Sequence, residues 1–207
     1  MLTNLPVTEL LAAFRSSNPT PGGGSASALA AAVGASLLAM VAGLPKPRAA
    51  TDEDARRLAD AGARCAEIAR QLEALVDADA RAYEHVTAAY RLPKSSDEEK
   101  ATRSASIQGA LVGAIEPPID VMRAGAAAID QAAIVAAFGN RNASSDVLVA
   151  LELLGAGVRG AKLNAEINLG TLKDAGRGEI LRSVLATLTN VCDAGIATAR
   201  ARLANSD

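Results

Sequence analysis

The chain has 207 residues and a formal net charge of −2, with a hydrophobic content of 50% but an aromatic content of only 2%. This charge does not attract a phosphate backbone, and few rings could stack on bases, so we expect no nucleic-acid partner. The length suits one domain covering residues 1–207. With so few aromatic residues, the core must consist of Ala, Leu, Val and Ile, and Ala is the strongest helix former. The composition therefore predicts an all-α protein with tight helix contacts.

The cysteines and the histidine are too few and too scattered for a metal site. Cys65 and Cys192 stand alone in helical patterns, and His85 is the only histidine. A zinc site needs more such ligands than these. We expect two reduced, buried thiols and a protein that requires no metal or cofactor.

The first predicted elements are a short helix and a longer, uncharged one. Val7–Arg15 has a short helical pattern, and the residues from Asn18 to Ser25 must form a loop because proline and consecutive glycines both oppose helix. A second helix should then run from Ser25, which can act as its N-cap, to Leu44.

The stretch from Ala26 to Leu44 has no charged residue and is long enough to imitate a membrane span. Ala, Gly and Ser dominate it, however, and these residues barely favour lipid. Glu9 and the Pro-Gly cluster ahead of it are the wrong flank for a signal peptide. We expect a cytoplasmic protein with no membrane role, in which this helix lies at the centre of the fold or at a subunit interface.

The rest of the chain predicts long helices with clear boundary signals. Ser96-Asp97-Glu98-Glu99 is a complete capping box, and Pro117-Pro118 should kink or break the helix that it opens. A turn is expected at Gly139–Asn142. The predicted helices run from Thr51 to Arg91, from Ser96 to Phe138, from Ser145 to Leu172 and from Glu179 to Leu203. The pattern therefore predicts a single-domain helical bundle with long, kinked helices.

One carboxylate falls where its helical pattern requires an apolar side chain. Asp79 fills the gap in the stripe between Leu75 and Tyr83, whereas its neighbours Asp77 and Arg81 should point outward. A buried carboxylate is costly unless it is paired, hydrogen-bonded or used in function. Asp79 is therefore either a satisfied core acid or a functional group.

Three further polar residues fall on one stripe of a later helix. Asn164 and Asn168 lie nearly opposite the charged Glu166, and Asp146 is within reach of the same stripe. The asparagines could simply hydrogen-bond between helices, and Asp146 could be a charge favoured by the helix dipole. Together with Asp79, they predict a polar cavity inside the bundle, which is a common place for a ligand site.

The loop Pro21-Gly22-Gly23-Gly24-Ser25 has two interpretations. Amides exposed ahead of a helix can bind an anionic or carbonyl group. No Gly-Lys-Ser/Thr follows, so the loop is not a P-loop. A simple tight turn fits the pattern equally well.

The same polar residues belong to motifs that are separated along the chain. In chain order these motifs are Pro19-Thr20-Pro21-Gly22-Gly23-Gly24-Ser25, Leu75-Val76-Asp77-Ala78-Asp79-Ala80, Ala89-Tyr90-Arg91-Leu92-Pro93-Lys94, Gly139-Asn140 with Ser145-Asp146, and Asn164 with Ile167-Asn168-Leu169. In their order and spacing, the chain resembles the cyclodeaminase/cyclohydrolase family over nearly its whole length. This family includes the C-terminal domain of formiminotransferase-cyclodeaminase and bacterial methenyltetrahydrofolate cyclohydrolases.

The resemblance implies an all-α homodimer that takes a tetrahydrofolate derivative as substrate and needs no metal. It points to Asp146 as the first choice for the catalytic acid/base and to Asp79 as the second. The residues implied to contact the substrate, including a lysine for its carboxylate tail, are Gly22, Gly23, Gly24, Ser25, Lys94, Asn140, Asn164 and Asn168. The segment Gly43–Ala50 departs from the family pattern, because it lacks the tyrosine that members usually carry there.

The resemblance leaves two reactions open, both at the same amidine carbon. A cyclohydrolase opens methenyltetrahydrofolate with water to give 10-formyltetrahydrofolate, whereas a cyclodeaminase closes the formimino group and releases ammonia. The 207 residues contain no transferase segment, so we expect the cyclohydrolase. A third alternative, supported by the altered segment after Leu44, is a folate-binding helical dimer without catalysis.

Overall fold

The computed structural model describes residues 1–204 as helices joined by short connections. The elements are the 3-10 helices η1 (Leu2–Asn4) and η2 (Arg141–Ala143) and the α-helices α1 (Val7–Phe14), α2 (Gly23–Gly43), α3 (Asp52–Tyr90), α4 (Asp97–Gly113), α5 (Glu116–Phe138), α6 (Ser144–Leu169) and α7 (Ala175–Ala204). No strand occurs within residues 1–204, which confirms the predicted all-α class.

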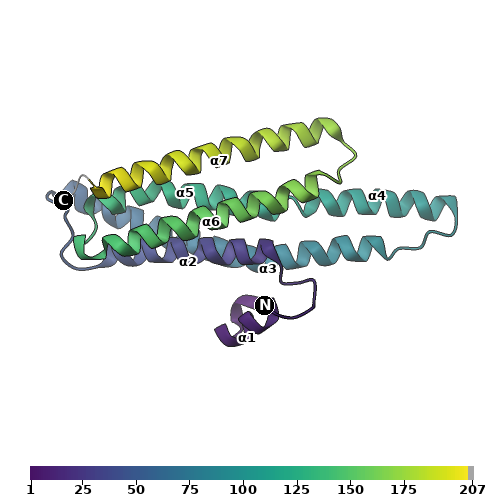
Figure 1. Cartoon of the computed structure of the whole chain (residues 1–207), viewed down its shortest axis with the longest axis horizontal. Coiled ribbons are helices and arrows are strands. Elements are labelled where there is room, and N and C mark those ends of the chain that lie inside the picture. The colour runs from purple at the N-terminus through teal and green to yellow at the C-terminus, as the bar shows by residue number, and fades with distance from the viewer. Residues whose placement is uncertain (205–207) are drawn as a thin grey trace.

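The long helices lie along one axis and form an elongated bundle (Figure 1). α3 has 39 residues, which corresponds to about 58 Å at the usual helical rise. The last part of α3 and α4 form a hairpin that projects beyond the other helices at one end, while α1 stands off the bundle (Figure 1). The start of α2 meets the end of α6 beside the C-terminal half of α3, because Gly23 lies against Asn164 and Gly24 against Asp79.

Small residues let α2 pack very closely against α6. A Cβ atom at Gly34 would lie 2.8 Å from the carbonyl oxygen of Ala150, and one at Gly157 would lie 2.7 Å from the carbonyl oxygen of Ser27. Contacts this short leave no room for any side chain, so the two backbones touch directly. The Ala- and Gly-rich composition thus has a structural role in helix packing.

Two helix boundaries differ from the prediction for physical reasons. α2 begins at Gly23, because Gly22 occupies the N-cap position and Ser25 lies inside the first turn. The helix expected from Ser96 to Phe138 is divided into α4 and α5, because Pro117 and Pro118 have no amide hydrogen and fit only at the start of a new helix. The capping box at Ser96 is confirmed.

Asp77 is buried, so the prediction that it points to solvent is wrong. The segment η1 folds over α3 and covers it: Leu2 N donates a hydrogen bond to Asp77 Oδ1 at 2.6 Å, and Thr3 Oγ1 donates one to Oδ2 at 3.1 Å. Helical periodicity could not reveal this contact, because the covering residues come from the distant N-terminal segment. Asp77 therefore anchors that segment to α3.

In the described part of the chain, residues 1–204, three helical stretches are long and apolar enough to cross a membrane, judged by length and composition alone: Gly23–Gly43, Asp97–Phe138 and Ala175–Ala204. In α2, 44% of the most apolar window is buried inside the bundle. Contact with the neighbouring helices therefore accounts for part of its apolar character. The absence of a membrane role stays a prediction.

We expect Gly157→Ala to lower the free energy of unfolding by about 2 kcal/mol, because even one methyl group would overpack the α2–α6 contact. The measurement is the urea unfolding midpoint, compared with the wild type at an unchanged m-value.

Gly109→Ala in α4 is the matched control, because nothing lies within 4 Å of the added Cβ atom. This substitution should raise the free energy of unfolding by about 0.5–1 kcal/mol through helix propensity alone. If both substitutions shifted stability in the same direction, the backbone contact would not explain why position 157 is glycine.

Candidate active site

The N-terminus of α2 is crowded against side chains of two other helices. A Cβ atom at Gly24 would collide with the carboxylate of Asp79 on α3, and one at Gly23 would lie 3.2 Å from Asn164 Nδ2 on α6. No glycine within residues 1–204 has a positive φ. Close approach to polar side chains, rather than a special turn conformation, therefore explains the glycines at positions 23 and 24.

Asp79 caps α2 from the neighbouring helix. Ser25 N donates a hydrogen bond to Asp79 Oδ2 at 2.8 Å, and Ser25 Oγ lies 3.1 Å from the same oxygen and 2.8 Å from the carbonyl oxygen of Val76. The first amides of a helix lack partners within the helix, and its N-terminus favours negative charge. The prediction that Ser25 itself is the N-cap is wrong, because its hydroxyl turns toward α3 and Asp79 supplies the accepting oxygen.

Burial raises the pKa of Asp79 above the ordinary aspartate value, and the hydrogen bonds from Ser25 oppose this rise only in part. The physical cause is the loss of hydration, which penalises the charged form. Asp79 is therefore a stronger base than an exposed aspartate. A carboxylate of this kind can accept a proton from water and return it within one reaction.

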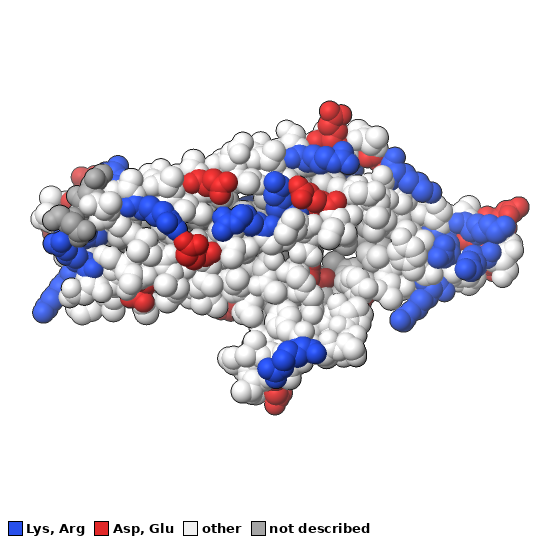
Figure 2. Space-filling view, in the orientation of Figure 1, with Lys and Arg blue, Asp and Glu red and all other residues white. Residues whose placement is uncertain are grey.

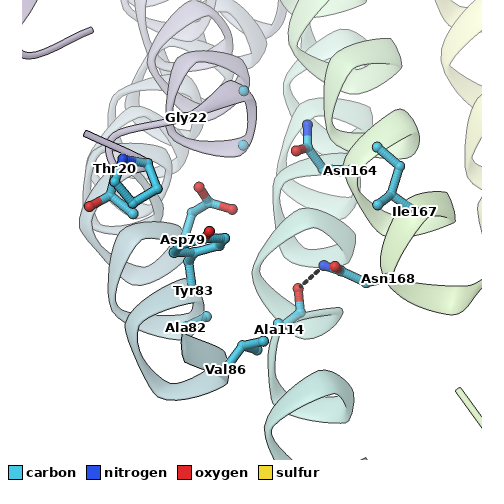
Figure 3. A pocket seen from close by; sticks show the side chains of 13 residues that line it. Thr20, Gly22, Asp79, Ala82, Tyr83, Val86, Ala114, Asn164, Ile167 and Asn168 are labelled. Carbon is cyan, nitrogen blue, oxygen red and sulfur yellow. Dashed lines mark hydrogen bonds between the residues drawn. The ribbon is translucent and has the colours of Figure 1, made fainter. Parts of the chain in front are cut away.

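Two amide side chains of α6 line the side of the cavity opposite Asp79 (Figure 3). Asn164 Nδ2 donates a hydrogen bond to the carbonyl oxygen of Gly160 at 2.9 Å, and Asn168 Nδ2 donates one to the carbonyl oxygen of Ala114 at 3.0 Å. These bonds fix the orientation of both amides. The amide oxygens can accept hydrogen bonds from a ligand, and the second N–H of each can donate.

Between these walls lies a cavity of about 250 Å³. Its lining residues are Pro19, Thr20, Gly22, Gly23, Gly24, Asp79, Ala82, Tyr83, Val86, Ala114, Asn164, Ile167 and Asn168. The side chains of Thr20 and Tyr83 lie next to Asp79 (Figure 3). The cavity thus combines apolar surface for a ring with one carboxylate and two amides, a combination typical of small-molecule sites.

The structure brings most of the predicted site residues together, but Asp146 lies elsewhere. Positions 146 and 164 share a stripe of α6 but are 18 residues apart, or about 27 Å along the helix. The expectation that Asp146 and the asparagines form one wall is therefore wrong within a single chain. Periodicity identifies the face of a helix and not the position along it.

Asn140 and Lys94 also lie away from the cavity. Asn140 Oδ1 accepts a hydrogen bond from Asn142 N at 2.9 Å, and its Nδ2 donates one to the carbonyl oxygen of Pro45 at 2.6 Å. Asn140 thereby ties the loop after α2 to the start of α6. Lys94 is exposed in the connection between α3 and α4. Neither residue lines the cavity, and their roles in binding stay predictions.

Sequence reasoning misses Tyr83 as a site residue, because it assigns this residue to the apolar stripe of α3. Tyr83 follows Asp79 by four residues, which places it one turn further along the same face. That spacing is the signal that could have identified it. Thr20 lies in a family-like motif, but nothing in its local pattern indicates that it reaches the cavity.

Within residues 1–204, no group of three His, Cys, Asp or Glu side chains could hold a metal ion. Burial raises the pKa of the Cys65 thiol to about 12 and that of Cys192 to about 11. Both thiols are therefore protonated near neutral pH, which makes them poor ligands and nucleophiles. Independence from metal stays a prediction.

Comparison with known proteins identifies relatives of this chain. Residues 6–186 match the family model described as formiminotransferase-cyclodeaminase. The chain is 38% identical over 177 residues to the methenyltetrahydrofolate cyclohydrolase of Methylorubrum extorquens, and the match covers 84% of each protein. It is 34% identical over 176 residues to the formimidoyltransferase-cyclodeaminase of Sus scrofa, of whose length it spans 32%.

A solved structure has the same fold over its whole length. It is the formiminotetrahydrofolate cyclodeaminase of Thermotoga maritima, with a TM-score of 0.84, 26% sequence identity, and coverage of 99% of this chain and 98% of that one. The region that matches the family model includes every residue that lines the cavity. The chain therefore belongs to the formiminotransferase-cyclodeaminase family.

Proposed function

We propose that the protein is a methenyltetrahydrofolate cyclohydrolase, which hydrolyses 5,10-methenyltetrahydrofolate to 10-formyltetrahydrofolate. The observation that carries this proposal is the 38% identity to a cyclohydrolase over 84% of both proteins. The cavity supports it chemically, because the substrate carries a cationic amidinium carbon and the cavity presents the carboxylate of Asp79. An anion fixed beside a developing or existing positive charge stabilises it.

Asp79 is the group best placed to act as acid and base. Water adds to the bridge carbon, and the carboxylate of Asp79 takes one of the water protons. The bond from that carbon to the nitrogen of the reduced pterin ring then breaks, and Asp79 returns the proton to this nitrogen. The hydroxyl group on the carbon loses its remaining proton to solvent and becomes the formyl C=O, which accounts for the proton released when the cationic substrate gives a neutral product. The raised pKa of Asp79 suits both halves of the exchange.

Asn164 and Asn168 hold the pterin in this proposal. A pterin edge carries both hydrogen-bond donors and acceptors, and an amide can satisfy either kind. Because their orientation is fixed by Gly160 and Ala114, the two amides can position the ring without reorganising. Such preorganisation brings the bridge carbon and Asp79 together at small entropic cost.

A cyclodeaminase is the second candidate, favoured by the likeness to the Thermotoga maritima cyclodeaminase over 98% of that chain. In that reaction the aminobenzoyl nitrogen attacks the formimino carbon, which is already bonded to the pterin ring nitrogen, and the bond from this carbon to the departing ammonia breaks. The same carboxyl could move the required proton.

Turnover assays with the methenyl and formimino substrates separate the two activities, and we expect the methenyl substrate to be hydrolysed. A protein that binds both substrates but converts neither would contradict both enzymatic proposals.

We also propose that the protein is a homodimer that pairs through an exposed apolar face of α2 and α6. This face is defined by Val33, Met40, Val149, Leu163 and Ile167, all of which are exposed. α2 has no charged residue, and Figure 2 shows the charged side chains of the visible face along α6 and α7, at both ends of the bundle and on α1. Apolar patches of this kind commonly mark interfaces.

Val33→Glu should convert the dimer to a monomer, because pairing would bury the new carboxylates without partners. Light scattering at micromolar concentration measures the mass directly. Val191→Glu is the control, because this residue of α7 is 52% exposed and lies outside the α2–α6 face. A wild-type chain that is monomeric at this concentration would contradict the dimer.

Asp79→Asn should lower kcat on 5,10-methenyltetrahydrofolate by at least about 100-fold, the usual scale for losing a general acid/base. The wild-type kcat/KM should also fall on the acid side with an apparent pKa above about 4, the ordinary aspartate value. This acid limb should be absent in Asp79→Asn. Steady-state kinetics between pH 4 and about 8 measure both effects.

Thermal melting of Asp79→Asn tests the physical state of the carboxylate. Burial raises the pKa of Asp79 in the folded state, so the protonated carboxyl favours folding. This stabilisation is fully present at a pH below the pKa that Asp79 has in the unfolded chain, and it is lost as the pH rises through the pKa that it has in the folded protein. At neutral pH a neutral amide should therefore leave the melting temperature unchanged or raise it. A folded Asp79→Asn variant with normal turnover would overturn the assignment of Asp79 as the catalytic acid and base.

Asp146→Asn provides the comparison with a second carboxylate that sequence reasoning favoured. Because Asp146 lies far from the cavity within one chain, this variant should lose much less activity than Asp79→Asn. An equal or larger loss would instead indicate that Asp146 reaches a site completed by a second subunit.

A further inference from the structure

The cavity is too small to hold a whole folate. Its volume of about 250 Å³ lies below the range of about 300–1,000 Å³ that is typical of pockets enclosing a drug-sized ligand. A folate consists of a pterin, an aminobenzoyl ring and a glutamate with free carboxylates. If the reacting bridge carbon lies near Asp79, the pterin fills the cavity, and the remainder must lie outside it.

A second hollow of about 190 Å³ continues from the cavity along α3. The two share Pro19, Thr20 and Tyr83 as lining residues, so the loop before α2 and the tyrosine ring border both. The second hollow is lined further by Glu84, Thr87, Ala88 and Arg91. It therefore forms a path from the reacting centre toward the C-terminal end of α3.

Arg91 is the cation that lines this hollow. It is the C-cap of α3 and follows Asp79 by 12 residues, which is about 18 Å along the helix. The aminobenzoyl ring, its amide and the glutamate chain can cover this span together with the long arginine side chain. Glu84 lies nearer to Tyr83 on the same helix, so it repels carboxylates from the near end of the hollow and favours their placement at Arg91.

We propose that this hollow is the subsite for the glutamate tail of the substrate, with Arg91 binding its carboxylate and the Tyr83 ring packing against the aminobenzoyl ring. The inference rests on the proposed function, because it takes a folate as the ligand. Arginine presents a planar fork of donors that matches a carboxylate, which makes it better suited to this role than a flexible lysine.

Two other cations lie outside these two hollows. Lys94, the residue expected from the sequence to bind the tail, lines neither hollow. Arg81 lines a different hollow beside Asp77, which shares only Thr20 with the cavity. A tail that reached Arg81 would therefore have to leave the path bordered by Tyr83.

The test compares two substrates in the full-length protein: 5,10-methenyltetrahydrofolate and the corresponding methenyl derivative of tetrahydropteroate, which lacks the glutamate. Arg91→Met keeps much of the apolar stem and removes the charge. It should raise KM for the complete substrate by about 10- to 100-fold, the usual worth of a hydrogen bond to a charged group. Its kcat should hardly change, because the tail is remote from the reacting carbon. KM for the truncated substrate should not change.

Matched variants separate a binding role from a structural one. Arg91→Lys should recover part of the lost affinity because it restores the charge, and Glu84→Gln should lower KM for the complete substrate because it removes a repulsive carboxylate. Arg81→Met should leave KM for both substrates unchanged. Lys94→Met tests the lysine expected from the sequence. If Lys94→Met or Arg81→Met, rather than Arg91→Met, raised KM selectively for the complete substrate, the assignment of the subsite would be wrong.

The outcomes also distinguish this inference from the proposed function. Wild-type turnover of both substrates, with equal effects of Arg91→Met on the two KM values, would overturn the subsite and leave the cyclohydrolase intact. A wild-type protein that converts neither substrate would overturn both proposals.

Discussion

The contact between the Asp79 carboxylate and the first turn of α2 determines where three helices meet. Asp79 accepts the hydrogen bonds of Ser25 at a helix N-terminus that has no side-chain cap of its own. This arrangement requires glycine at position 24, because any side chain there would strike the carboxylate. The cavity forms beside this contact, and its other wall consists of the end of α6. A single interaction thus fixes both the helix packing and the place of the chemistry.

The same contact keeps a partly buried carboxylate available for reaction. The N-terminal amides of α2 compensate it only in part, since burial still raises its pKa. A fully compensated aspartate would be a weaker base, whereas an uncompensated one would be neutral and would lose its attraction for a cation. The fold therefore accepts a local cost in stability at Asp79, and the close backbone packing of α2 on α6 provides stabilisation elsewhere in the bundle.

Local patterns in the sequence predict the helices and part of the site. Capping residues and prolines mark the boundaries, because their effects act within one helical turn. Asp79, Asn164 and Asn168 stand out because they interrupt an apolar stripe. Asp146 and Asp77 could not be placed in this way. Whether Asp146 reaches the cavity depends on its distance along α6, and the burial of Asp77 depends on the N-terminal segment that covers it. The capping of α2 by Asp79 is likewise a contact between helices, which no local pattern contains.

The cavity borders the exposed apolar face of α2 and α6 on one side and the second hollow on the other, and these two sides affect different kinetic constants. Ile167 lines the cavity and also belongs to the exposed apolar face of α2 and α6, so a subunit docked there would shield that side from water. On the other side, Tyr83 opens toward the hollow that contains Arg91. Exclusion of water keeps the pKa of Asp79 raised and so makes it a stronger base toward the attacking water, which acts on kcat. In the proposed subsite, contacts to the remote tail would be the same in the ground and transition states and would therefore act on KM.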